Sequence, residues 1–155
     1  MEKGNSPLGA ARGEPVWNLL AILIFGLVVD FLLSWRLPDW PWPFALGLVL
    51  ILSGTVLMVW AASEFSRHKT TLLPSEAAST IVKSGPYRYT RNPIYLSMAL
   101  AYSGISMAFD SPVALLLVLV VVVLLNRQAV REERYLEGAF GEQFTEYKRR
   151  VRRWL

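Results

Sequence analysis

A short polar stretch between two long apolar runs, residues 83–95, holds the side chains best suited to chemistry. It contains two prolines, one glycine, three tyrosines and two arginines, whereas a simple connector needs only a few small polar residues. Gly85-Pro86 predicts a turn, and Asn92-Pro93 predicts a helix that begins at Pro93 with Asn92 as its N-cap. The free N–H groups and positive dipole end of that helix would suit an anion such as a carboxylate or phosphate.

Two adjacent acids, Glu132 and Glu133, form a second feature that could take part in chemistry. In a helix, Glu132 shares a face with apolar residues such as Leu125, whereas Glu133 lies on a more polar face. An acid among core residues must be paired to be tolerated, and the loop offers Arg88 and Arg91 as cationic partners. From the helix alone, an ordinary solvated charged face is the simpler interpretation.

The composition predicts that these residues belong to a membrane protein. The chain of 155 residues is one domain by length, but 54% of its residues are hydrophobic and its mean hydropathy is +0.36, which is too apolar for an ordinary soluble domain. Cysteine is absent and there is one histidine, so we expect no disulfide, no cysteine nucleophile and no metal site. The basic residues border the apolar runs, which fits membrane topology and anionic lipid better than nucleic acid.

Four apolar stretches predict an all-α membrane protein with four transmembrane helices. The expected spans are residues 16–35, 44–65, 93–109 and 113–130, within a single membrane domain over residues 1–155. Residues 1–15 are expected to be a flexible tail, and residues 131–155 are expected to form cytoplasmic or interfacial helices.

Smaller features predict how these helices pack and end. Gly47 and Gly54 are seven residues apart on one helix face, a spacing that permits close helix contact. A single long helix should run from residue 113 past the membrane edge until Gly138 or Gly141 ends it. Residues 75–82 could add a short helix before the loop.

The C-terminal residues have the pattern of an amphipathic helix at the membrane surface. Its apolar side would consist of Phe140, Phe144, Tyr147, Val151 and Trp154, and its basic side of Lys148, Arg149, Arg150, Arg152 and Arg153. We expect the basic side to face anionic head groups.

Asp30 interrupts the first apolar stretch near its far end. An acid within a span is a functional candidate. Its position favours a structural interpretation, in which it reaches interfacial water or Arg36.

The distribution of basic residues predicts the orientation of the chain in the membrane. Of sixteen Lys and Arg residues, two precede the first span, five lie between the second and third spans, and eight follow Leu125. With four spans, these three segments fall on the same side. The positive-inside rule then places both termini and the polar loop in the cytoplasm.

The loop and the paired acids together resemble a known family. The sequence Gly-Pro-Tyr-Arg-Tyr-Thr-Arg-Asn-Pro-Ile-Tyr at residues 85–95 is followed by Glu-Glu-x-x-Leu at residues 132–136 and by Phe-Gly at residues 140–141. In this order and separation, the motifs are similar to those of isoprenylcysteine carboxyl methyltransferases and their phospholipid methyltransferase relatives. The resemblance spans about residues 65–152. The isoprenylcysteine enzymes commonly have histidine where this chain has Asn92, so the resemblance extends to the cofactor more directly than to a prenylcysteine substrate.

This resemblance implies an integral membrane enzyme that holds S-adenosylmethionine between the loop and the C-terminal helix. The helix end at Asn92-Pro93 could take the cofactor's carboxylate, Glu132 or Glu133 its ammonium, and a tyrosine face its sulfonium. The expected cofactor-binding residues are Tyr87, Arg88, Tyr89, Asn92, Pro93, Tyr95, Glu132 and Glu133. The expected catalytic residues are Arg91, Glu132 and Glu133.

The chemical class of the methyl acceptor can be narrowed, because some acceptors must lose a proton to a base and others need not. A carboxylate is already ionised at neutral pH, whereas an amine must lose a proton and His68 is the lone histidine. We therefore expect a lipid-like or prenylated carboxylate, as in isoprenylcysteine O-methylation, with Arg91 or Arg88 orienting it. N-methylation of a phospholipid and S-methylation of a small thiol are the alternatives. A different class is a small four-span transporter with Asp30 as its coupling acid, which would leave the tyrosine-rich loop without a role.

Overall fold

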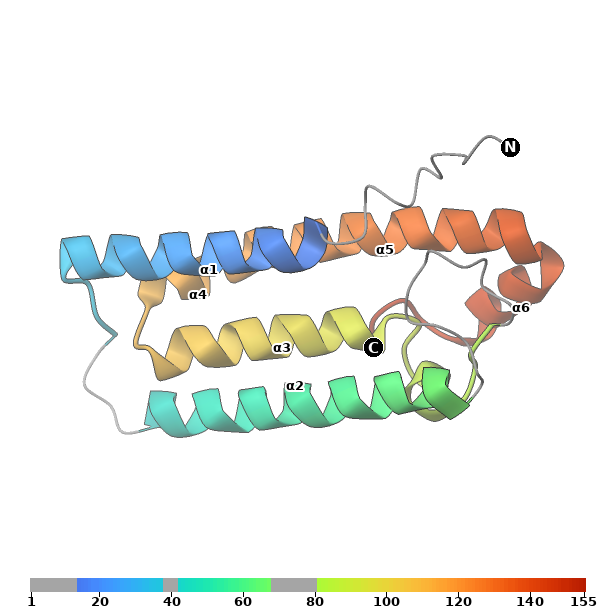
Figure 1. Ribbon diagram of the computed structural model, residues 1–155, viewed down its shortest axis with the longest axis horizontal. Helices are drawn as coiled ribbons and strands as arrows, with labels where there is room; N and C mark the ends of the chain where they lie inside the picture. Colours follow the sequence, from blue (N-terminus) through green and yellow to red (C-terminus); the bar gives the residue numbers. More distant parts are fainter. Residues whose placement is uncertain (1–13, 38–41, 68–80) are drawn as a thin grey trace, which may run out of the picture.

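A computed structural model describes residues 14–37, 42–67 and 81–155, which form an all-α protein (Figure 1). Its elements are α1 (Glu14–Leu33), α2 (Trp42–Arg67), the short 3₁₀ helix η1 (Gly85–Arg88), α3 (Pro93–Ala108), α4 (Pro112–Leu116), α5 (Val118–Phe140) and α6 (Glu142–Arg150). The β structure of these residues is limited to one isolated parallel bridge between Thr90 and Arg152. The predicted all-helical class is confirmed.

Two of the predicted local features fall largely outside the described residues. They are the N-terminal tail, of which residues 1–13 are not described, and the short helix over residues 75–82. The last two residues of that segment, Ile81 and Val82, are described and are not helical.

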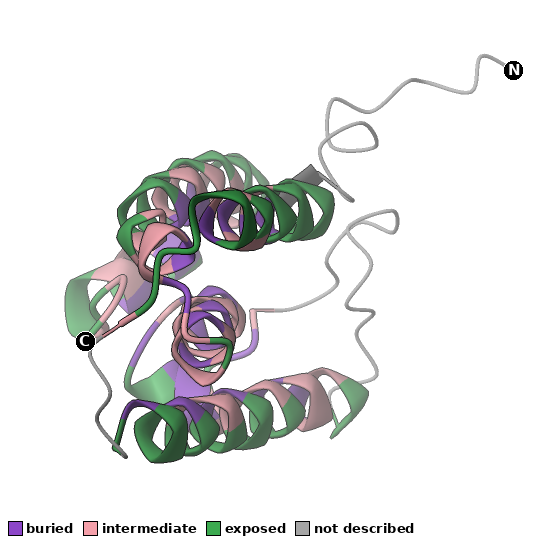
Figure 2. Cartoon of the chain, turned by 90° about the vertical axis from the view of Figure 1, so that its left-hand side faces the viewer, coloured by how far each residue is buried: buried purple, intermediate pink, exposed green. Residues whose placement is uncertain are grey.

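Three helical stretches are long and apolar enough to cross a membrane. They are Val16–Leu33, Trp42–Arg67 and Pro112–Phe140, and only 17–22% of the residues in their apolar windows are buried. The side chains exposed on them include Phe31 and Leu119, at 75% and 72% exposure, and exposed residues line the outer faces of the bundle (Figure 2). Such a surface is suited to lipid rather than to water. The chain is therefore an integral membrane protein.

The helix α3 differs from the other predicted spans. Its 16 residues extend about 24 Å at 1.5 Å per residue, less than a hydrocarbon core of about 30 Å. It lies between α2 on one side and α1 with α4 and α5 on the other (Figure 1). Three candidate spans are thus identified among the described residues, and a fourth span through α3 stays a prediction.

Glycines allow α2 and α3 to approach closely. A Cβ atom on Gly47 would lie 2.7 Å from the Gly104 carbonyl oxygen, and one on Gly54 would lie 2.8 Å from the Ser97 carbonyl oxygen. Neither backbone could accept such a contact without moving. The predicted packing role of Gly47 and Gly54 is confirmed, and this contact fixes the start of α3 beside the end of α2.

Asp30 has partners that the sequence did not indicate. It is 2% exposed, and its carboxylate accepts hydrogen bonds from the Ser111 hydroxyl and from the Val113 backbone N–H at 3.2 Å. The expected contact with interfacial water or Arg36 is therefore wrong, because α1 packs this side chain against the first turn of α4. Asp30 joins two helices, whereas a coupling acid would need access to water.

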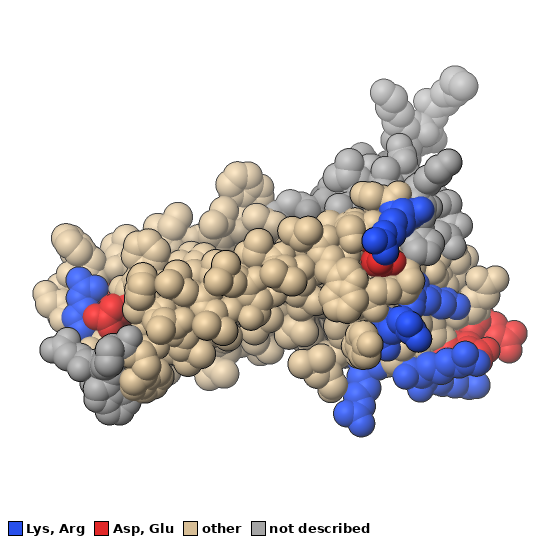
Figure 3. All heavy atoms as spheres, turned by 90° about the horizontal axis from the view of Figure 1, so that it is seen from below, with Lys and Arg blue, Asp and Glu red and all other residues tan. Residues whose placement is uncertain are grey.

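The last predicted span is nearly continuous, with an irregularity at Leu117 between α4 and α5. The Leu117 N–H donates to the Val113 carbonyl and the Leu117 carbonyl accepts from the Val121 N–H, both at 3.0 Å. The helical path therefore continues to Phe140, and Gly141, with a φ of 53°, ends it. Basic side chains gather mainly at one end of the molecule, beyond a broad uncharged band (Figure 3).

The C-terminal amphipathic helix is shorter than predicted. The helix α6 ends at Arg150, and Val151 is extended, with φ −120° and ψ 133°. Phe144 and Tyr147 are buried, at 2% and 6% exposure. Trp154 does not continue the helix but packs against the core formed by α1, α3 and α5. The prediction that Val151 and Trp154 share one helix with Phe144 is wrong, because the chain turns back toward the polar loop.

Candidate active site

The polar loop begins with a tight turn held by Gly85 and Glu64. Gly85 has a φ of +58°, which favours glycine, and a Cβ atom there would lie 2.6 Å from Glu64 Cγ. The Glu64 side chain is buried and accepts hydrogen bonds from the Ser84 hydroxyl and from Arg67 at 3.2 Å. The predicted turn at Gly85-Pro86 is confirmed, and Glu64 anchors it to the end of α2.

The loop ends at Asn92, where α3 begins. Pro93 is the first residue of α3, as predicted, and the Asn92 carbonyl accepts a hydrogen bond from the Leu96 N–H at 3.0 Å. The Asn92 side chain, however, makes no capping hydrogen bond. Its amide donates to the Arg153 carbonyl at 3.3 Å and to the Glu133 carboxylate at 3.5 Å. The predicted side-chain cap is wrong, because groups from the C-terminal part of the chain engage the amide.

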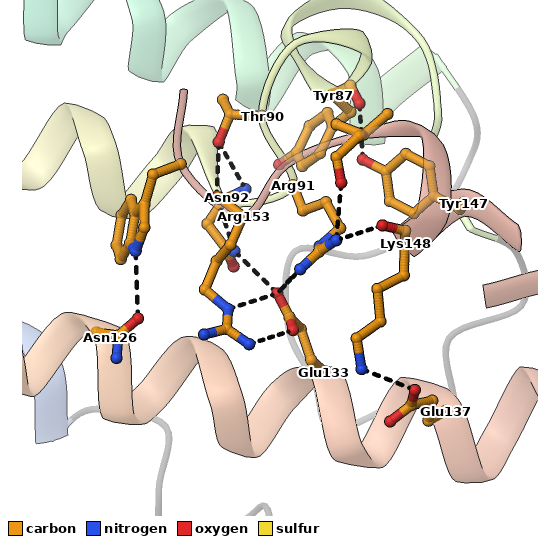
Figure 4. Close-up of polar contacts among 12 residues, drawn as sticks. Tyr87, Thr90, Arg91, Asn92, Asn126, Glu133, Glu137, Tyr147, Lys148 and Arg153 are labelled. Carbon is orange, nitrogen blue, oxygen red and sulfur yellow. Dashed lines mark hydrogen bonds and ion pairs between the residues drawn. The ribbon is translucent and has the colours of Figure 1, made fainter. Parts of the chain in front are cut away.

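Glu133 lies at the centre of the site, where it rises from α5 between two arginines (Figure 4). It is 4% exposed. Its Oε1 accepts from Arg91 Nε at 3.1 Å and from Arg153 Nε at 3.0 Å, and its Oε2 accepts from Arg153 Nη2 at 2.9 Å. The hydrogen bond to this carboxylate raises the pKa of the Arg153 guanidinium. Two fixed positive charges therefore compensate one buried carboxylate, which makes its burial tolerable.

Arg91 joins the loop to the C-terminal segment, residues 148–155. Its Nη1 donates to the carbonyls of Lys148 and Val151 at 2.9 and 2.7 Å, and its backbone N–H donates to the Arg152 carbonyl at 3.0 Å. Arg153 in this segment points toward Glu133, so the prediction that its side chain faces lipid head groups is wrong. The C-terminal segment thus forms one wall of the site.

Glu132 belongs to a separate polar cluster. Its Oε1 accepts hydrogen bonds from the Tyr95 hydroxyl and from Gln128 Nε2, the latter at 3.2 Å. Its side chain is half-buried. Within the described part of the chain, no hydrogen bond reaches its Oε2.

The arginine partner that the sequence suggested for Glu132 belongs instead to Glu133. The buried positions of α5 follow steps of four residues from Val121 through Leu125 and Ala129 to Glu133. Glu133 therefore shares the core-facing side of α5 and takes Arg91 as its partner, so its predicted placement on a more polar face is wrong. Glu132 also turns toward the bundle, where Tyr95 of the core cluster donates to it, but it does not pair with an arginine.

Tyr87 connects the loop to α2 and α6. Its ring packs edge-on against Phe65, with 5.5 Å between centroids, and its carbonyl accepts a hydrogen bond from the Tyr147 hydroxyl at 2.7 Å. Burial raises the pKa of the Tyr87 phenol, and Tyr147 and the negative charges of Glu132 and Glu64 raise it further. The phenol is therefore protonated at neutral pH and lies within electrostatic reach of both acids.

The structure brings most of the predicted site residues to one end of the bundle. Those that converge are Tyr87, Arg91, Asn92, Pro93, Tyr95, Glu132 and Glu133. The other two, Arg88 and Tyr89, are exposed. The part that each residue plays toward a cofactor stays a prediction.

Sequence reasoning missed several residues that shape the site. Glu64 could have been found, because it lies one turn after Ala61, which continues the seven-residue spacing of Gly47 and Gly54, and an acid beside a packing face needs a partner. Gln128 lies one turn before Glu132 on the same helix and could have been found in the same way. Nothing in the sequence distinguished Arg153 as a site residue, because it belongs to a run of similar basic residues.

The fold and the site define an α-helical integral membrane protein with a polar site where the charged residues gather at the end of the bundle. Residues 42–143 match the family described as phospholipid methyltransferase. This match covers more than half of the chain. The chain therefore belongs to this family of membrane methyltransferases, and the predicted resemblance is confirmed.

Named relatives include two isoprenylcysteine methyltransferases and a protein named for metal resistance. The chain is 30% identical over 111 residues to the protein-S-isoprenylcysteine O-methyltransferase of Saccharomyces cerevisiae, covering 68% of this chain and 46% of that protein. It is 29% identical over 113 residues to protein-S-isoprenylcysteine O-methyltransferase B of Arabidopsis thaliana, covering 71% and 57%. It is also 31% identical over 139 residues to the cobalt-zinc-cadmium resistance protein CzcN of Cupriavidus metallidurans, covering 88% and 60%. The chain spans about half the length of these relatives. No solved structure matches it.

Proposed function

We propose that this chain is an S-adenosylmethionine-dependent methyltransferase that acts on a lipid-borne or small hydrophobic acceptor in the membrane. The observation that carries the proposal is the convergence of the loop with Glu132 and Glu133 at one end of an apolar bundle. Membership of the family supports it. Bound S-adenosylmethionine would supply the electrophilic methyl group.

The side chains present fit the charges of this cofactor. Glu132 has one carboxylate oxygen without a hydrogen bond among the described residues, which suits an ammonium group. Arg88 is exposed and makes no ion pair in the same part of the chain, which suits a carboxylate. The ring of Tyr89, which is 66% exposed, offers a face for a sulfonium, whereas Tyr95 is packed in the core.

In this proposal, Glu133, Arg91 and Asn92 hold the loop in place rather than contact the cofactor. Glu133 is already compensated by two arginines. A cofactor ammonium that displaced either arginine would leave a largely buried guanidinium without its partner, at a cost that the new contact would have to offset. We therefore assign the ammonium to Glu132 and the positioning of the loop to Glu133.

The acceptor in this proposal is a carboxylate on a lipid-like or prenylated molecule. A carboxylate needs no base at neutral pH, because it is already ionised. The alternatives are a phospholipid amine, for which a glutamate or water would have to take the proton, and a small thiol. Incubation of the purified protein with labelled S-adenosylmethionine and a lipid extract of its host would separate them, because ester, amine and thioether products differ chemically.

The cofactor assignment predicts a large effect of Glu132→Gln. This substitution keeps the shape of the side chain and removes its charge, so loss of one charge-assisted contact should cost about 1.5–3 kcal/mol, a ten- to hundredfold loss of affinity. Calorimetric titration with S-adenosylhomocysteine measures it. Glu142→Gln, at an exposed position on α6, is the matched control and should bind like the wild type. Equal affinities for all three proteins would remove Glu132 from the cofactor site.

The orientation of the chain is a second part of the proposal. We place both termini and the polar loop in the cytoplasm, because basic residues flank the apolar runs on that side. The chain has no cysteine, so single cysteines at Arg36 and at Arg88 can be labelled with an impermeant reagent in intact cells. Cys at position 36 should react and Cys at position 88 should react only after lysis. The opposite pattern would mean that the chain has the inverse orientation. Reaction of both cysteines in intact cells would mean that the two positions do not lie on opposite sides of the membrane, which would reject the proposed topology.

A further inference from the structure

Three arginines of α5 form an exposed stripe that the proposed site does not use. Arg127, Arg131 and Arg134 are all exposed, and none of them makes a hydrogen bond or ion pair with another described residue. At 100° per residue, their spacing of four and three places them within an arc of about 60°. We call these three residues the arginine stripe.

The acids on the same helix leave this stripe uncompensated. Glu133 is engaged by Arg91 and Arg153, and Glu137 pairs with Lys148 at 2.8 Å. Both pairs draw their cations from outside α5, and Glu132, the third acid of α5, accepts hydrogen bonds from Tyr95 and Gln128 rather than from the stripe. The stripe therefore presents three positive charges to whatever lies beside it.

The stripe continues the lipid-facing surface of α5. Val120 and Val123 precede Arg127 on the same face, are 46% and 51% exposed, and belong to a candidate membrane span. From Arg127 to Arg134 the helix rises about 10 Å, whereas the head-group layer on each side of the hydrocarbon core is about 5–8 Å thick. A helix whose valines contact acyl chains thus carries its first arginines at the level of the lipid phosphates.

We propose that the arginine stripe binds the head groups of anionic phospholipids in the surrounding leaflet. Guanidinium groups form paired hydrogen bonds with phosphate oxygens, and the valines on the same face hold the acyl chains of the same lipids. Zwitterionic lipids fit less well, because their own ammonium group offsets the phosphate charge. This surface is separate from the residues assigned to the cofactor and does not depend on the methyltransferase proposal.

The test compares lipid preference in full-length protein purified in a neutral detergent. Short-chain phosphatidylglycerol and phosphatidylcholine of equal chain length are titrated at low salt, and bound lipid is counted by native mass spectrometry. Wild-type protein should prefer phosphatidylglycerol. Each arginine near an anionic surface contributes roughly fivefold, so the triple variant Arg127→Gln, Arg131→Gln, Arg134→Gln should lose this preference by tenfold or more. A triple lysine variant at the same positions should retain only part of it, because lysine keeps the charge but cannot form the paired hydrogen bonds.

A matched control removes the same charge elsewhere. Arg149, Arg150 and Arg152 are also exposed, and Arg150 is already paired with Glu146, so replacing all three with glutamine should lower the preference by less than the stripe variant does. An equal loss in both triple variants would mean that diffuse charge attracts the lipid, which would overturn the proposal. A wild type without the preference would also overturn it and would leave the stripe for an acidic protein partner. Binding of S-adenosylhomocysteine by the stripe variant should equal that of the wild type whether or not the lipid proposal holds.

Discussion

Replacing Glu133 with glutamine should destabilise the folded protein by about 3 kcal/mol, because breaking a buried ion pair leaves a charge without compensation. The side chains of Glu133 and Arg91 are only 5% and 8% exposed, so solvent cannot replace the lost partner. The new amide would also present N–H donors toward guanidinium groups that are themselves donors. Titration of the full-length protein from mild detergent into sodium dodecyl sulfate, followed by far-UV circular dichroism, measures the change.

Glu137→Gln is the control for this prediction. It makes the same chemical change on the same helix, but Glu137 and its partner Lys148 are each 37% exposed. Solvent screening limits such a pair to about 1 kcal/mol or less. Equal destabilisation by the two substitutions would show that Glu133 is not the centre of the site.

The start and the end of the helices were predictable because local backbone chemistry fixes them. Pro93 can begin a helix but not continue one, and Gly141 can adopt the φ of 53° that ends α5 at little cost. The turn at Gly85 was predictable for the same reason. These positions depend on a few adjacent residues, so a single sequence contains the information that places them.

The choice between Glu132 and Glu133 could not be made from the sequence. Both residues continue a helical face that includes Leu125 and Ala129, since 3.6 residues per turn allows a step of three or of four. Which acid turns inward depends on the rotation of α5 about its own axis. That rotation is fixed by packing of Val121 and its neighbours against α1 and α3, which is a property of the whole bundle.

Contacts between distant segments could not be predicted from a sequence pattern either. The five residues at the C-terminus read as the continuation of an amphipathic helix, yet they pair with a loop about sixty positions earlier. Periodicity describes one helix at a time, so it cannot reveal a bridge that two irregular segments form together. Asp30 is a similar case, because its partners begin another helix, at Ser111 and Val113.

Deletion of residues 151–155 should release the polar loop while leaving the membrane helices folded. The deletion removes the Arg152 carbonyl that accepts from the Arg91 N–H at 3.0 Å and the Arg153 carbonyl that accepts from the Thr90 hydroxyl at 2.9 Å. It also removes the Arg153 guanidinium from Glu133. Hydrogen bonds of about 1 kcal/mol each and a lost charge partner together should cost about 3–5 kcal/mol of local stability.

Hydrogen exchange followed by mass spectrometry tests this deletion at the residues concerned. Amide protection over residues 88–92 should fall by a hundredfold or more, because a local opening that costs about 3 kcal/mol less is that much more populated. Protection within α2 and the membrane part of α5 should stay at the wild-type level. Deletion of Leu155 alone, a residue that is 76% exposed, is the control and should change nothing. Unchanged protection of the loop after removal of all five residues would mean that Glu64 and Glu133 hold it without the C-terminal segment. If the loop is released, binding of S-adenosylhomocysteine should weaken with it, since the arginine and tyrosine side chains proposed to meet the cofactor would no longer be held in one arrangement.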